Sequence, residues 1–205
     1  MRKLFGGLAF VCVLATAWLL ALHAQEAELG KAAPDFSLED MDGKPRSLSE
    51  FKDKFVVLEW VNHGCPFVKK HYDSGNMQAL QKDMKDKGAV WLSICSSAEG
   101  KQGHFSGEEW EKLNQEKGTN ADAVLLDPDG AVGKSYGAKT TPHMFVIHPN
   151  GTLIYKGAMD DKPSTDRADI KSAQNFVRLA MDQSLAGRNV RYPLTRPYGC
   201  SVKYK

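Results

Sequence analysis

One cysteine of this chain stands where a helix is expected to begin. Residues 60–72 read WVNHGCPFVKKHY, so Cys65 follows an apolar run and directly precedes Pro66. Proline suits the first helical position because its missing amide hydrogen would have no partner there. A sulfur atom at the preceding cap position faces unpaired amide hydrogens and the positive end of the helix dipole, which favour thiolate over thiol. The pKa of Cys65 is therefore expected to lie below about 8.5, with Lys69 and Lys70 either contributing or simply solvated; the alternative is an inert core cysteine.

A partner thiol for Cys65 has to come from outside its own helical turn. Position 68, where a thiol–disulfide exchanger often carries a second cysteine, holds Val68. Cys95 is one candidate, because it ends the run GAVWLSIC at 88–95, which should lie beside FVVLEWV at 55–61 in a parallel sheet. Parallel strands end at one edge of a sheet, where the Cα separation of roughly 4.4 to 6.8 Å that a disulfide needs can be met. An equally good interpretation of Cys95 is a filler at the edge of the core.

Cys200 is the second candidate. It lies in the sequence RPYGCSVKY at 196–204, within an extended tail of residues 188–205. A tail thiol can resolve an adduct in its own domain or in a neighbouring subunit; otherwise it stays free or pairs with Cys95. A third hypothesis has no resolving cysteine, so that an external thiol releases the adduct formed at Cys65.

The first 24 residues have the pattern of a secretory signal peptide. A basic start precedes an uncharged apolar run at 4–22, and Ala24 ends a plausible cleavage site. The run is also long enough to cross a bilayer as an uncleaved anchor, and only then is a membrane contact expected. Either way the domain is expected to be periplasmic or secreted. Cleavage would remove Cys12 and leave three cysteines, an odd number that favours a free or transiently paired thiol.

The rest of the chain has the composition of an ordinary globular protein. Its 205 residues include 42% apolar and 25% charged residues, with a formal net charge of +2. This balance favours one domain, residues 25–187, followed by the tail, and gives no reason to expect a nucleic-acid partner.

Strands and helices are expected to alternate. Buried strands are predicted at 55–61, 88–95 and 123–127, and a hairpin at 143–148 and 152–157 around Pro149-Asn150-Gly151. Helices are predicted at 66–86 with a break at Ser74-Gly75, at 108–118, at 132–137 and, as one long amphipathic helix, at 166–187. Ser47 and Glu50 have the spacing of a capping box. This order predicts an α/β fold with a parallel core and an antiparallel edge.

Three segments, in this order, resemble one family of redox proteins. They are APDFSLEDMDGKPRSLSEFKDKFVVLEWV at 33–61, the helix-opening cysteine, and TTPHMFVIHPNGTLIYKG at 140–157. They are similar to redoxins of the peroxiredoxin-like (AhpC/TSA) and TlpA-like group, over roughly residues 28 to 185. The resemblance implies a thioredoxin-like fold: a central mixed sheet with flanking helices, an N-terminal extension and a C-terminal tail. It also implies that Cys65 is the reactive thiol, that Thr141 and a cis Pro142 shape a substrate groove beside it, and that no cofactor is needed.

The chain departs from both branches of that group. Peroxiredoxins place proline seven residues and threonine or serine three residues before the cysteine, and arginine three residues before the hairpin phenylalanine. Here these positions hold Leu58, Asn62 and Pro142. Asn62 can replace one hydrogen-bond donor, but nothing replaces the arginine, so much of the stabilisation of peroxide reduction is missing. Val68 argues in turn against an efficient general disulfide reductase.

We therefore expect an exported thiol oxidoreductase with an antioxidant or thiol–disulfide role. The Cys65 thiolate would react with a disulfide or a hydroperoxide, beside Asn62, Pro66 and the Thr141-Pro142 groove, and an external thiol or thioredoxin-like protein would reduce it. The alternatives are a non-enzymatic binding module that uses the same groove, and a copper chaperone. Three histidines are expected near Cys65, and they are interpreted as groups that orient the thiolate rather than as ligands of a metal: His63, His71 and His143.

Overall fold

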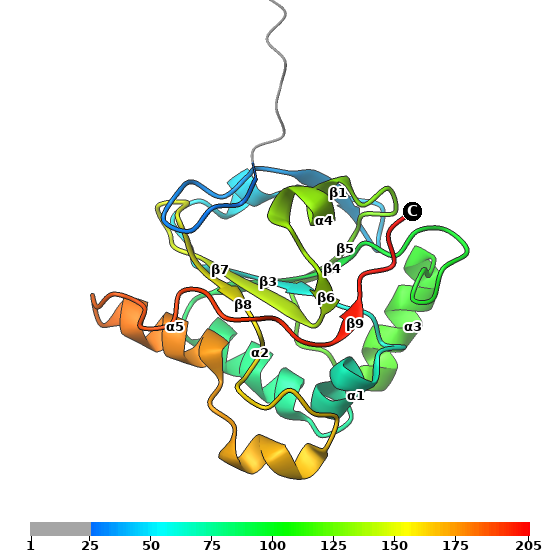
Figure 1. Cartoon of the computed structure of the whole chain (residues 1–205). Coiled ribbons are helices and arrows are strands. Elements are labelled where there is room, and N and C mark those ends of the chain that lie inside the picture. Colours follow the sequence, from blue (N-terminus) through cyan, green and yellow to red (C-terminus); the bar gives the residue numbers. More distant parts are fainter. Residues whose placement is uncertain (1–25) are drawn as a thin grey trace, which may run out of the picture.

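The computed structural model of this chain describes residues 26–205 and is built around a seven-stranded mixed sheet (Figure 1). The strand order is β2-β1-β5-β4-β3-β7-β8. The strands are β1 (Ser37–Asp40), β2 (Pro45–Ser47), β3 (Val56–Trp60), β4 (Val90–Cys95), β5 (Ala123–Leu126), β7 (His143–Ile147) and β8 (Leu153–Gly157). The predicted leader, with Cys12, lies outside the described residues.

The centre of the sheet is parallel and its edges are antiparallel. β4 pairs in parallel with both β3 and β5, whereas β7 pairs antiparallel with β3 and β8, and β1 pairs antiparallel with β5. Every residue of β3, β4 and β7 is buried, as expected for strands covered on both faces. The predicted α/β architecture with a central mixed sheet and flanking helices is therefore confirmed.

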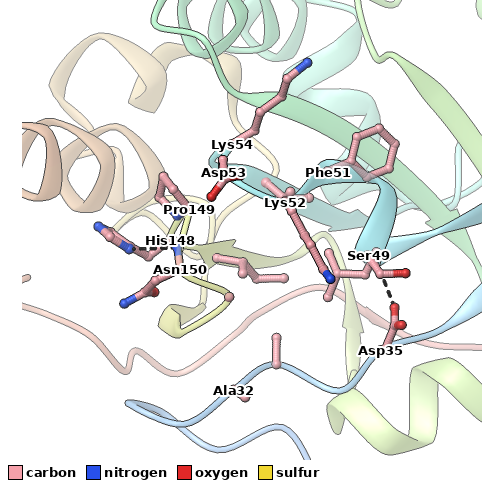
Figure 2. Close-up of a pocket in the computed structure, with 15 residues that line it drawn as sticks. Ala32, Asp35, Ser49, Phe51, Lys52, Asp53, Lys54, His148, Pro149 and Asn150 are labelled. Atoms are coloured by element: carbon pink, nitrogen blue, oxygen red, sulfur yellow. Dashed lines mark hydrogen bonds between the residues drawn. The ribbon is translucent and has the colours of Figure 1, made fainter.

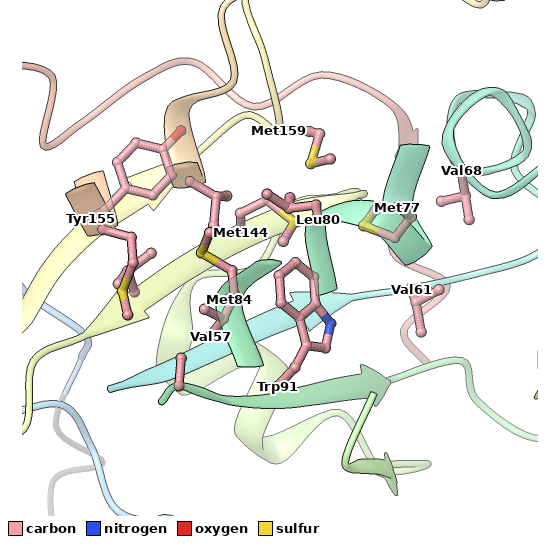
Figure 3. Close-up of a cluster of buried hydrophobic side chains, with 14 of the residues drawn as sticks. Val57, Val61, Val68, Met77, Leu80, Met84, Trp91, Met144, Tyr155 and Met159 are labelled. Atoms are coloured by element: carbon pink, nitrogen blue, oxygen red, sulfur yellow. The ribbon is translucent and has the colours of Figure 1, made fainter. Parts of the chain in front are cut away.

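Helices cover the two faces of the sheet unequally. α1 (Pro66–Tyr72), α2 (Asn76–Asp86), α3 (Gly107–Lys117) and α5 (Phe176–Leu185) lie on one side of the sheet, and α4 (Ala131–Tyr136) lies on the other with the N-terminal segment (Figure 1). Figure 3 shows the larger of the two cores, in which methionines of α2 meet aliphatic and aromatic residues of the sheet. Its labelled members are Val57, Val61, Val68, Met77, Leu80, Met84, Trp91, Met144, Tyr155 and Met159. Among residues 26–205, no helix combines the length and the apolar character needed to cross a membrane.

Several local predictions are confirmed. The first helical segment is interrupted, since α1 ends at Tyr72 and α2 begins at Asn76 after Gly75, whose φ is +75°. The Ser47–Glu50 capping box is present at a short 3₁₀ helix, η1 (Leu48–Phe51).

The prediction of one long helix at 166–187 is wrong. A 3₁₀ helix, η2 (Arg167–Ser172), is followed by an extended Ala173, and α5 then begins anew. Asn175 caps α5, because its side chain accepts a hydrogen bond from the N–H of Arg178. The N–H of Phe176 donates to the carbonyl of Met159 at 3.1 Å instead of to a preceding helical turn. The apolar spacing continued across the break, but the cap and the Met159 contact set a new helix start.

Candidate active site

Cys65 lies at the start of α1, just beyond the end of β3. Its backbone is extended, with φ −79° and ψ 127°, and Pro66 takes the first helical position. The N–H of Lys69 donates to the Cys65 carbonyl at 2.9 Å, which makes Cys65 the N-cap residue, as predicted. The side chain of Cys65 is fully buried, with 0% of its surface exposed.

The Thr141-Pro142 peptide bond is cis and lies against Cys65. β7 begins immediately after it and pairs with β3 in a register that sets His143 opposite Trp60. The residues before β7 are therefore carried to the edge of the sheet where the loop to α1 begins. The Cys65 thiol donates a hydrogen bond to the carbonyl oxygen of Thr141 at 3.0 Å. The cis proline that the resemblance implied is thus present beside the cysteine.

Cys200 reaches the same place from the far end of the chain. The tail forms a short strand, β9 (Cys200–Ser201), which pairs antiparallel with β6 (Thr140–Thr141) and sets Cys200 opposite Thr141. This pairing brings Cys200 beside Cys65, and the thiol and the backbone N–H of Cys200 both lower the pKa of Cys65. The sequence left two candidate partners for Cys65, and the structure places Cys200, partly buried, against it.

The pKa values of the two thiols are shifted in opposite directions. Burial raises the pKa of Cys65, but donors outweigh it and hold the pKa below its ordinary value: the Cys200 thiol, the N–H groups of Val68 and Cys200, and the Thr141 hydroxyl. That hydroxyl is buried and makes no hydrogen bond of ordinary geometry among the described residues. Burial and the neighbouring Cys65 raise the pKa of Cys200 to about 11. Of the two, Cys65 is the thiol prepared to be a thiolate.

The two lysines proposed to assist Cys65 are not its main electrostatic support. The largest contributions that lower the pKa of Cys65 are hydrogen bonds rather than charges. Lys70 is buried and its Nζ donates to the carbonyl of Lys162 at 3.1 Å, and Lys69 is exposed.

Cys95 contacts a different part of the molecule. It ends β4, and its thiol donates to the carbonyl of Gly103 at 3.2 Å. Burial raises its pKa, so the thiol form is favoured there. Among residues 26–205, no hydrogen bond joins Cys95 to Cys65. Its assignment as a resolving cysteine stays a prediction, and its contacts fit the filler interpretation.

Asn62 supports the loops around Cys65. Its Oδ1 accepts from the N–H of Gly64 at 2.8 Å, and its Nδ2 donates to the carbonyl of Gln102 at 3.0 Å. A Cβ at Gly103 would overlap the Asn62 amide, so the loop lies directly on this side chain. The amide expected to orient a peroxide thus makes hydrogen bonds within the protein.

The three histidines are buried and neutral rather than grouped around the thiol. Burial lowers the pKa of His63 and His71 to about 4 and that of His143 to about 3. The polar and ring contacts of these histidines are with residues other than Cys65: Tyr72, Trp110, Asn76, Asp160, Lys139 and Phe145. Within the described part of the chain, no three His, Cys, Asp or Glu side chains form a metal-binding group. The interpretation of these histidines as groups that orient the thiolate is not supported.

Sequence reasoning missed a buried acid behind the site. Glu59 lies in β3, fully buried, and accepts hydrogen bonds from Tyr72 Oη at 3.0 Å, Trp91 Nε1 at 2.9 Å and Ser93 Oγ at 3.2 Å. Burial raises its pKa to about 7. The sequence contained one sign of this buried acid, a single glutamate inside the apolar run FVVLEWV. Apolar patterning alone predicts a buried strand there and gives no role to the glutamate.

A second concave region lies at the other end of β3. Figure 2 shows this pocket of about 380 Å³, which includes Lys52, Lys54, His148 and the start of β3 at Val56. Cys65 follows the opposite end of β3, and no cysteine lines the pocket. It is therefore separate from the thiol site.

Comparison with known proteins finds a matching family and similar sequences and structures. A sequence profile of the family described as Redoxin matches residues 28–174. The thiol-disulfide oxidoreductase ResA of Bacillus subtilis is 28% identical over 149 residues, which cover 72% of this chain and 78% of ResA. The crystal structure of an uncharacterized conserved protein from Geobacillus kaustophilus has 30% identity and a TM-score of 0.75, covering 87% of this chain and 93% of that protein.

The fold is that of thioredoxin. The thioredoxin domain of a thiol-disulfide oxidoreductase from Bacteroides vulgatus superposes with a TM-score of 0.51 at 23% identity, over 72% of this chain and 97% of that domain. The thioredoxin-like fold that the family resemblance implied is confirmed.

Proposed function

This chain belongs to the redoxin family, and we propose that it is a thiol–disulfide oxidoreductase in which Cys65 attacks and Cys200 resolves. The observation that carries the proposal is the placement of the Cys200 thiol and N–H against the Cys65 sulfur beside Thr141-Pro142. The names of the relatives, among them ResA, support the class of reaction.

In the first step the Cys65 thiolate attacks one sulfur of a substrate disulfide. The Cys65–substrate S–S bond forms as the substrate bond breaks, and the departing sulfur leaves as a thiolate that takes up a proton. The lowered pKa of Cys65 increases the fraction of the thiolate, which is the attacking species.

In the second step Cys200 loses its proton to solvent and attacks the Cys65 sulfur. A Cys65–Cys200 disulfide forms, and the remaining substrate sulfur leaves as a thiolate, so the substrate has gained two electrons. The neighbouring Cys65 contributes to the high pKa of Cys200, and this contribution disappears once Cys65 is bonded to substrate. Cys200 therefore becomes easier to ionise when its thiolate is needed. An external thiol or thioredoxin-like protein then reduces the disulfide.

A disulfide is favoured over a hydroperoxide as the oxidant. Peroxide reduction needs donors that stabilise the charge developing on the leaving oxygen. Asn62 donates to Gln102, and position 142, where peroxiredoxins carry arginine, holds proline. The proposal includes export to the periplasm or the exterior, which rests on the signal-peptide pattern of residues 1–24.

The test is peptide mapping of the mature chain after reaction with a small disulfide or with hydrogen peroxide. We expect a Cys65–Cys200 disulfide, formed faster with the disulfide reagent. Cys200→Ser should stop at a mixed disulfide on Cys65, while the control Cys95→Ser should behave as the unmodified protein. A Cys65–Cys95 bond would contradict the assignment of Cys200, and full cellular function of Cys65→Ser would favour the binding module.

A further inference from the structure

The chain's own tail covers Thr140 and Thr141, the segment beside Cys65. Figure 1 shows the tail, in red, leaving α5 and running past β8 to β9 beside β6. β9 pairs with Thr140 and Thr141, and beyond it the N–H of Val202 donates to the carbonyl of Lys139 at 3.1 Å. The tail therefore occupies the edge on which the redox site opens.

Contacts on both sides of Cys200 hold the tail in place. Before it, Tyr198 donates a hydrogen bond to the buried carboxylate of Asp160, and its ring meets Phe67 of α1 edge to face at 5.8 Å. After it, Tyr204 donates to the carbonyl of Ala138 at 2.8 Å.

A third anchor lies further upstream. Thr195 Oγ1 hydrogen-bonds with Tyr155 Oη at 2.7 Å and accepts from the N–H of Ala158 at 2.9 Å. With Tyr198 and Tyr204, this gives the tail polar anchors along the length that crosses the site.

One glycine allows the tail to lie this close. Gly199 has φ +140°, and a Cβ there would overlap the carbonyl oxygen of Thr141. The overlap is with backbone of the groove rather than with a flexible side chain, so it cannot be relieved by a rotamer change. Gly199 is therefore required for close contact between the tail and Thr141.

Docking of the tail has a consequence for access. Cys65 exposes 0% of its surface, so a disulfide from outside cannot approach its sulfur while the tail is bound. We propose that residues 198–204 are an autoinhibitory strap, which occupies the position of a substrate strand and has to leave before an external disulfide reaches Cys65. This inference rests on the proposed role of Cys65. It adds that one segment, residues 198–204, both carries the resolving thiol and blocks the substrate.

The test measures how fast a small alkylating reagent modifies Cys65 in the reduced full chain. It uses a Cys200→Ser background, which keeps a hydroxyl donor at that position and removes the competing thiol. Gly199→Ala is added to release the strap. Gly187→Ala is the matched control, because Gly187 also has positive φ, but a Cβ there meets nothing within 4 Å. The rate is followed against pH by mass spectrometry, so that the limiting rate reports access separately from ionisation.

Release of the strap should raise the limiting rate about tenfold or more, since the observed rate scales with the fraction of open molecules. Gly187→Ala should leave the rate unchanged. An equal limiting rate with and without Gly199→Ala, in variants shown to be folded by circular dichroism, would overturn the strap. A faster rate without any Cys65–Cys200 disulfide in the unmodified chain would keep the strap and refute the proposed reaction instead.

Discussion

Glu59 should make the protein less stable as the pH rises through neutrality. Burial raises the pKa of this carboxyl from an ordinary value of 4.5 to about 7 in the folded chain. Between these values the folded state holds a proton that the unfolded state has lost. Stability from this group is therefore complete below pH 4.5, declines between pH 4.5 and about 7, and is lost once the pH has risen through 7.

The size of the effect follows from the two pKa values. One pKa unit corresponds to about 1.4 kcal/mol, so ionisation of Glu59 should lower the free energy of unfolding by about 2.5 kcal/mol between pH 5 and pH 8. Glu59→Gln cannot ionise. The loss of hydrogen bonds in this variant costs the same free energy at every pH. Between pH 5 and pH 8 the free energy of unfolding of Glu59→Gln should therefore rise by about 2.5 kcal/mol relative to that of the unmodified chain.

The assay is urea unfolding followed by tryptophan fluorescence, at several pH values and with a reductant. The difference between the two proteins is compared across pH, which cancels the titration of all other groups, the buried histidines included. Glu111→Gln, on the exposed side of α3, is the control for the same change of residue away from the core. Tyr72→Phe removes a donor that lowers the Glu59 pKa, so the decline should move to higher pH. A flat difference for Glu59→Gln would show that the hydrogen bonds to the carboxylate fully offset its burial, and would refute the reasoning.

Two further predictions concern the histidines and the cysteine pair. The contribution of His63 to stability should fall as the pH drops from 6.5 toward 4, because His63, which has a pKa of about 4 when folded, stays neutral there while the unfolded chain takes up a proton. His63→Phe, which keeps a ring against Tyr72, should reduce this loss in urea unfolding at pH 5, and an unchanged loss would contradict a buried neutral His63. Cys200→Ala removes the largest hydrogen bond that lowers the pKa of Cys65, so the thiolate absorbance of Cys65 should titrate at higher pH than in Cys200→Ser. Coincident titrations would mean that the side chain at position 200 does not act on the Cys65 sulfur.

Local sequence signals predicted the elements that depend on neighbouring residues. The Cys65-Pro66 helix start and the break at Gly75 are decided within a turn or two, by capping, by proline geometry and by positive φ. The helix predicted at 166–187 failed because its break depends on Met159, which lies in a different segment of the chain. Apolar spacing alone does not contain that contact.

Residue types and spacing are enough to place Cys65 at a helix start after a buried strand, with no second thiol in its turn, and to leave Cys95, Cys200 or an outside molecule as its partner. Which thiol lies against Cys65 follows only from the folded chain. Pairing of β9 with β6 brings Cys200 to Thr141, while Cys95 contacts Gly103. The position of Cys200 depends on backbone pairing between distant segments, which no local pattern of residue types encodes, and that of Cys95 on the loop that returns to its thiol after β4. The same is true of the strap, because its cover of Cys65 exists only once the last residues return to the first helix.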